Sequence, residues 1–171
     1  MSSTPSHRLA HRRPFGVRRN ARGFTTLELV MVVAVGVIMT AVAIPLVQSS
    51  LRSFRMSSAV SSVTGAIEST RYRAIFDGCP YRISFNNATN TYQISSTVTG
   101  GACAAAYTNV GGAVPFGSTG QVALSQNLTF QFSPGGSVQT VAGAPTFTLT
   151  YVGTTNLKTI TVTKYGSITV Q

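Results

Sequence analysis

The sequence predicts an α+β fold, in which a long N-terminal helix packs its second half on an antiparallel β-sheet domain. Two observations lead to this prediction. Apolar residues keep helical spacing from Phe24 to about Phe76, and from Tyr81 onward apolar and polar residues alternate with a period of two. A helix followed by a run of strands, with no alternating helices, is typical of an α+β arrangement.

The chain divides into three predicted parts: a basic leader over 1–23, the long helix over 24–77 and a β-rich domain over 78–171. The formal charge of +10 resides largely in the leader. Six of the thirteen basic residues lie there: Arg8, Arg12, Arg13, Arg18, Arg19 and Arg22. The high pI therefore says little about the rest of the chain, and it is no argument for nucleic-acid binding.

The first half of the predicted helix is apolar all round. Residues 29–47 are uncharged, and as a helix they extend about 28 Å, close to the roughly 30 Å hydrocarbon core of a bilayer. This run is longer than the apolar part of a signal peptide, which spans about 7–15 residues. We therefore predict one transmembrane span over about 27–47. The arginines hold the N-terminus in the cytoplasm, and the C-terminal domain is exported.

The second half of the helix becomes amphipathic. Its apolar residues keep helical spacing: Val60, Val63, Ile67, Ala74 and Ile75. Pro45 lacks a backbone N–H, so we expect it to kink the helix near the membrane surface. The helix is expected to end at Asp77-Gly78.

Alternation predicts six strands in the C-terminal domain. Residues 81–85 and 91–95 flank an Asn-rich turn and favour a hairpin. Further alternating runs occupy 128–132, 146–152, 158–163 and 167–170. The small, Gly-rich stretch Ala102–Gly120 lacks a pattern and is expected to be a loop.

The composition argues against an enzyme. Both histidines, His7 and His11, lie in the leader, and beyond Glu28 the acidic residues are Glu68 and Asp77. No Ser-His-Asp or Cys-His system and no usual zinc or calcium site can be assembled from such residues. We predict no catalytic residue, no metal and no cofactor.

Two further features have alternative interpretations. Cys79 and Cys103 are the two cysteines of a chain predicted to be exported, so a disulfide is favoured over two unrelated buried thiols. The basic residues Arg52, Arg55, Arg71 and Arg73 could form a DNA-binding stripe. A headgroup-level anchor followed by a solvated helix face is the favoured interpretation, so nucleic acid is not expected as a partner.

Glu28 is the one charge between residues 27 and 47. A carboxylate inside an apolar helix costs about 2.5–3.5 kcal/mol on insertion-type scales, depending on depth. If the chain is cut between Gly23 and Phe24, the new α-amine lies just over one turn from Glu28. Stacked helices offset by one turn would pair the amine of one subunit with the Glu28 carboxylate of another. Glu28 would then fix the axial register between neighbouring subunits. The alternative is a chance polar residue in an ordinary membrane anchor.

The segment from Gly23 to Pro45 resembles the class III signal segment of type IV pilins and type II secretion pseudopilins. The resemblance implies that a prepilin peptidase cleaves after Gly23 and N-methylates Phe24. It also implies that Glu28 is required for assembly with other pseudopilins or pilins in the bacterial inner membrane, with the C-terminal domain in the periplasm. Pro45 stands at the helix-breaking position of these families.

The remainder is similar to the H-type minor pseudopilins (GspH) and the related FimT pilins, through residues 71–85 and 130–138 and the final pair of strands. This implies a minor pseudopilin of a type II secretion system, which takes part in protein transport. A FimT-like minor pilin of a type IV pilus, with a DNA-uptake role, is the alternative. Ser167 and Thr169 stand where DNA-uptake members carry arginines, which weakens the inference of DNA binding.

Overall fold

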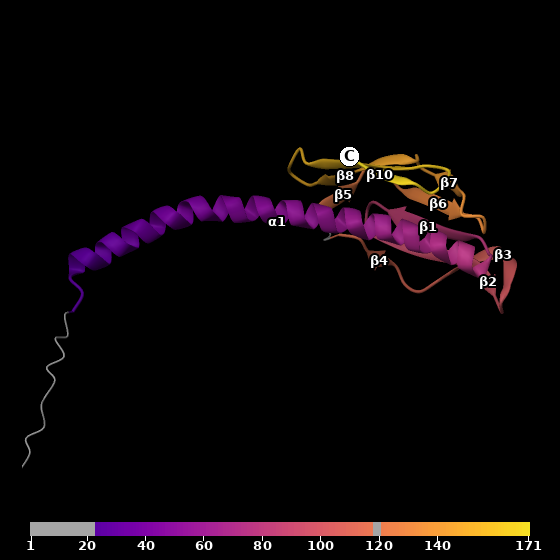
Figure 1. Ribbon diagram of the computed structural model, residues 1–171, viewed down its shortest axis with the longest axis horizontal. Helices are drawn as coiled ribbons and strands as arrows, with labels where there is room; N and C mark the ends of the chain where they lie inside the picture. The colour runs from indigo at the N-terminus through magenta and orange to yellow at the C-terminus, as the bar shows by residue number, and fades with distance from the viewer. Residues whose placement is uncertain (1–22, 118–120) are drawn as a thin grey trace, which may run out of the picture. The chain divides into compact units, whose positions relative to one another are not determined.

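The computed structural model describes residues 23–117 and 121–171, so the predicted leader lies outside the described residues apart from Gly23. One helix, α1 (Thr26–Asp77), precedes ten strands in the described part of the chain (Figure 1). The chain divides into two compact units, and the boundary lies between Ala43 and Ile44. A long apolar N-terminal helix followed by antiparallel sheets confirms the predicted α+β class.

Helix α1 changes character along its length. Residues 26–55 are exposed, whereas the segment 56–77 contributes a buried stripe. The stripe consists of Met56, Ala59, Val63, Ala66, Ile67, Thr70 and Ala74. Its spacing of three and four residues is that of one helix face. Thr70 belongs to this stripe because its hydroxyl donates to the Ala66 carbonyl oxygen at 2.7 Å, which satisfies the buried polar group.

The strands form two antiparallel sheets within residues 44–171. The larger sheet has the order β3-β2-β1-β6-β7, with β4 also paired to β2, and the smaller has the order β10-β9-β8-β5. Their bounds are β1 Tyr81–Asn86, β2 Thr91–Thr99, β3 Ala102–Asn109, β4 Val114–Pro115, β5 Val122–Leu124, β6 Leu128–Phe132, β7 Val138–Ala142, β8 Thr146–Tyr151, β9 Leu157–Val162 and β10 Ile168–Val170.

One hydrophobic core joins the second part of α1 to both sheets. In β1 the alternate residues Tyr81, Ile83 and Phe85 are buried, and in β6 so are Leu128, Phe130 and Phe132. The smaller sheet supplies Phe147, Leu149 and Ile160. Period-two alternation therefore places one face of each of these strands in the core.

Two sequence-based expectations about the sheets were wrong. The strands form two sheets instead of one, because alternation identifies strands without saying which of them pair. Ala102–Gly120 is not a loop throughout, since it contains β3 and β4. Strand β3 is exposed along its length except for the half-buried Tyr107, so it has no buried face to produce an alternating pattern. Its pairing with β2 shifts register between Ser96 and Val98.

The end of α1 is tied to strands of the larger sheet. A disulfide joins Cys79, just after the helix, to Cys103 in β3 across 24 residues of sequence. The hydroxyl of Tyr81 in β1 donates to the carboxylate of Asp77, the last residue of α1. Burial first, and then this hydrogen bond, raise the pKa of Tyr81 above its ordinary value. Helix and sheet thus meet through covalent and polar links at this point.

Arg71 links α1 to two turns. Its Nε donates to the Gly136 carbonyl oxygen at 2.9 Å, in the turn between β6 and β7. A Cβ atom at Gly166, between β9 and β10, would lie 2.4 Å from the same nitrogen. Gly136 and Gly166 both have φ near +80°, a conformation that favours glycine, so both turns approach the guanidinium closely. Arg71 is therefore a packing residue between the turns of the two sheets.

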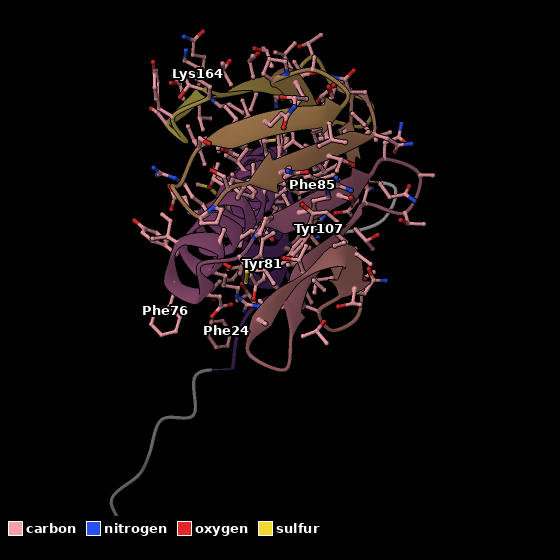
Figure 2. All side chains as sticks on the ribbon, turned by 90° about the vertical axis from the view of Figure 1, so that its right-hand side faces the viewer. Phe24, Phe76, Tyr81, Phe85, Tyr107 and Lys164 are labelled. Carbon is pink, nitrogen blue, oxygen red and sulfur yellow. A yellow bond between two sulfur atoms is a disulfide. The ribbon has the colours of Figure 1, made fainter. Side chains whose placement is uncertain are left out.

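Ile75 departs from the predicted apolar face, because its side chain is 45% exposed. Thr70 and Ala74 continue the buried stripe, and Ile75 lies one position beyond it. Phe76 is 90% exposed and projects from the end of the helix (Figure 2). The apolar spacing therefore identified the helix face correctly but extended it one residue too far.

Candidate functional site

The site predicted from sequence lies at the start of α1. The Thr25 hydroxyl accepts a hydrogen bond from the Glu28 backbone N–H at 3.2 Å, and the Thr25 carbonyl accepts from the Leu29 N–H at 3.1 Å. Thr25 is thus the N-cap of the helix and Glu28 is three residues beyond it, the spacing of a capping box. The local sequence explains why α1 begins here.

The position of Glu28 offsets part of the cost of its charge. A carboxylate in the first turn interacts favourably with the helix dipole, by about 0.3–1 kcal/mol. That is less than the roughly 2.5–3.5 kcal/mol that a carboxylate costs at the centre of an apolar span. Within residues 23–117 and 121–171 no side chain donates a hydrogen bond or forms an ion pair with the Glu28 carboxylate. Among the described residues, the Glu28 carboxylate is therefore favoured by the helix dipole alone.

The apolar segment (residues 29–47) finds no protein partner in the described chain. Every residue in it is exposed, with Val37 and Ile38 more than 60% exposed. α1 is the one helix among the described residues that is long and apolar enough to cross a membrane. Exposed apolar surface of this extent requires a lipid or protein environment.

Phe24 and Pro45 lie at the two ends of this region. Phe24 precedes α1 and is 83% exposed, with Gly23 directly before it. Pro45 lies inside α1, where helical structure continues on both sides. One residue later, the Leu46 carbonyl oxygen accepts from the hydroxyls of Ser49 at 2.9 Å and Ser50 at 3.1 Å. The kink expected at Pro45 remains a prediction.

The β-domain offers little chemistry of its own. The described residues contain no group of three His, Cys, Asp or Glu side chains that could hold a metal ion. Of the basic residues, Arg71 bonds to Gly136, and Arg82 donates to Gln131 Oε1 at 2.8 and 3.0 Å. The Arg82 guanidinium also lies 3.8 Å from the centre of the Tyr107 ring. Both arginines are engaged in packing the domain.

The remaining basic residues of the β-domain are dispersed. Lys164 lies 5.0 Å from the centre of the Tyr165 ring, and Figure 2 shows it on the far side of the domain from Phe76. β10 carries no basic residue. No continuous basic stripe runs along the strands that the structure describes.

Sequence reasoning missed one residue of the site, Thr25. The signal was present, because Thr-x-x-Glu directly before an apolar run is a helix-start pattern. The structure brings Thr25 and Glu28 together, and it also joins Cys79 to Cys103. Comparison of the chain with protein-family models, with curated proteins and with solved structures finds no match.

Proposed function

We propose that this chain is a non-enzymatic, type IV pilin-like subunit, a minor pseudopilin of a type II secretion system. In this proposal a prepilin peptidase cleaves after Gly23 and methylates the amine of Phe24. The apolar segment then anchors the subunit in the inner membrane and afterwards forms the core of a short filament. The β-domain faces the periplasm.

One observation carries the proposal: Glu28 is a charged residue directly before the exposed apolar segment, and its carboxylate has no partner among the described residues. The helix dipole compensates only part of the cost of placing this carboxylate in a membrane. An ammonium group 4 Å away is worth about 4 kcal/mol at an effective dielectric constant of 20. The amine of Phe24 in a neighbouring subunit supplies such a group.

Helix geometry sets the stagger between subunits. Glu28 lies four positions after Phe24, which in a helix extended to Phe24 corresponds to about 6 Å along the axis, close to one 5.4 Å turn. A neighbour displaced by this distance brings its amine to the level of Glu28. The charge pair then favours one axial register over others.

The absence of basic residues from β10 supports a secretion role over DNA uptake. Arg71 and Arg82 are occupied by contacts within the domain, which leaves few charges for phosphate groups. Binding through few phosphate contacts is weak and salt-sensitive. We therefore expect no duplex-DNA binding tighter than about 10⁻⁵ M at physiological salt.

The test replaces Glu28 with Gln or Val in cells that contain the prepilin peptidase and partner subunits. Membrane insertion is retained, whereas crosslinking to other pilin-like subunits is lost, because the partner amine is left buried and unpaired. Glu68→Gln is the matched control, since Glu68 is exposed and lies on the second part of α1. Wild-type crosslinking by Glu28→Gln contradicts the proposal.

Processing is measured on the same samples by intact mass. The expected mature chain begins at Phe24 and carries one additional methyl group. A chain that begins elsewhere, or that keeps its leader in the presence of active peptidase, removes the proposed role of Gly23 and Phe24.

A further inference from the structure

Basic and apolar side chains are exposed together at one end of the β-domain. Arg52, Phe54 and Arg55 follow the apolar segment on α1, and Leu157 and Lys158 begin β9. Phe54 is 72% exposed and Leu157 is 55% exposed. We call these five residues the collar.

A groove of about 330 Å³ lies between α1 and the part of the collar formed by Leu157 and Lys158. Ser53, Met56 and Ser57 line it from α1, residues 155–156 line it from the β8–β9 turn, and residues 157–158 line it from the start of β9. No acidic residue is among the lining residues. Arg55 lines a second hollow on α1 together with Phe54. The collar therefore presents positive charge and apolar side chains on more than one side of α1.

Helix geometry places the two arginines of the collar within side-chain reach of lipid headgroups, since Arg55 lies about 12 Å beyond Val47 along the helix axis. Arg52 follows Val47, the last residue of the apolar segment, by five residues, or about 7.5 Å along the axis. The headgroup region adds roughly 5–7 Å on each side of the hydrocarbon core. Arginine and lysine side chains reach several ångströms further toward a surface. The next acidic residue after the collar, Glu68, lies about 20 Å beyond Arg55 along a helix axis.

We propose that the collar docks on anionic phospholipid headgroups of the membrane that α1 enters. Arg52, Arg55 and Lys158 pair with phosphate groups, while Phe54 and Leu157 insert at the interface. The β-domain is thereby held against the bilayer by a second contact besides the span itself. This inference rests on the proposed membrane insertion of the apolar segment.

The experiment measures the depth of the β8–β9 turn in the full chain, reconstituted in lipid nanodiscs. A nitroxide is attached to Thr155→Cys, while Cys79 and Cys103 stay joined in their disulfide. The collision rates of the nitroxide with oxygen and with a water-soluble nickel chelate give the depth of the turn. We expect headgroup-level depth in equal amounts of phosphatidylglycerol and phosphatidylcholine, and water-like exposure in phosphatidylcholine alone.

Variants then test the assigned residues. Arg55→Gln/Lys158→Gln should lower the ratio of docked to undocked protein roughly thirtyfold in the anionic discs, about fivefold for each charge. Arg73→Gln/Lys164→Gln removes the same charge outside the collar and should leave the depth unchanged. Equal nickel exposure in both lipids, or equal effects of the two double variants, overturns the proposal.

A second label separates this inference from its premise. A nitroxide at Val37→Cys lies deep in the bilayer if the apolar segment spans it. A shallow Val37 label rejects the membrane span itself. A deep Val37 label with a water-exposed Thr155 label rejects the collar alone.

Discussion

The apolar segment (residues 29–47) and the packed segment (residues 56–77) belong to one helix, yet they are stabilised by different surroundings. Ile38 is 64% exposed, whereas Ile67 is 1% exposed in the core with both sheets. In the packed segment, tertiary contacts stabilise the helix, as is usual for amphipathic helices in proteins. The apolar segment has no such contacts within the described chain, so tertiary packing there does not account for its helical structure.

The comparison also shows how polar groups are handled in each segment. Thr70, Arg71 and Asp77 have partners in the packed segment. Glu28 receives only a capping contact through its backbone N–H. These three polar groups are thus bonded within the domain, whereas the Glu28 carboxylate has no hydrogen bond or ion pair among the described residues.

The largest expected effect comes from matched truncations in the two segments. Ile67→Ala should lower the free energy of unfolding by about 2–5 kcal/mol, because it leaves a cavity in the core. Ile38→Ala should change it by less than about 0.5 kcal/mol in detergent, since no protein atoms pack on it in the described chain. Denaturant titration of the full chain followed by circular dichroism measures both. Equal losses would abolish the distinction between the segments.

Removal of the disulfide should have the next largest effect. Cys79→Ser/Cys103→Ser releases a loop with a sequence separation of 24, which corresponds to about 2–4 kcal/mol of stability. The same titration with and without reductant measures the loss in the wild-type protein. Thiol labelling under denaturing conditions is the control, and it should fail until a reductant is added. Ready labelling of both cysteines contradicts the link.

Arg71 and Arg73 provide a smaller, paired test within the packed segment. Arg71→Ala should cost about 1–3 kcal/mol, because it removes the hydrogen bond to Gly136 and the packing between two turns. Arg73→Ala should be nearly neutral, since Arg73 is exposed. Thermal unfolding of both variants decides whether Arg71 is a structural residue. Equal melting temperatures of the two variants would contradict a structural role for Arg71.

The smallest effect is a dependence on alkaline pH. Burial and the Asp77 hydrogen bond raise the pKa of Tyr81, so the folded state retains its proton at a pH where the unfolded chain loses it. This contribution to stability is complete below about pH 10 and is lost as the pH rises through the raised pKa. Tyr81→Phe should flatten the alkaline limb of the stability curve. Tyr165→Phe, at an exposed position, should leave that limb unchanged.

Local patterns in the sequence determined much of this protein. The apolar run predicts a span, the spacing of Val63 and Ile67 predicts the buried helix face, and alternation predicts β1, β2, β6, β8, β9 and β10. These patterns are readable because each depends on periodicity within one element. The start of α1 was readable as well, since Thr25 and Glu28 lie three residues apart.

Tertiary structure decided the features that depend on contacts between distant segments of the chain. The division of the strands into two sheets depends on pairings between distant segments, such as β5 with β8. β3 exists through its pairing with β2 and its disulfide to Cys79, while its own side chains are mostly exposed. Arg71 became a structural residue because two glycine turns from different sheets approach its guanidinium. Such contacts join residues far apart in the chain, where no local signal records them.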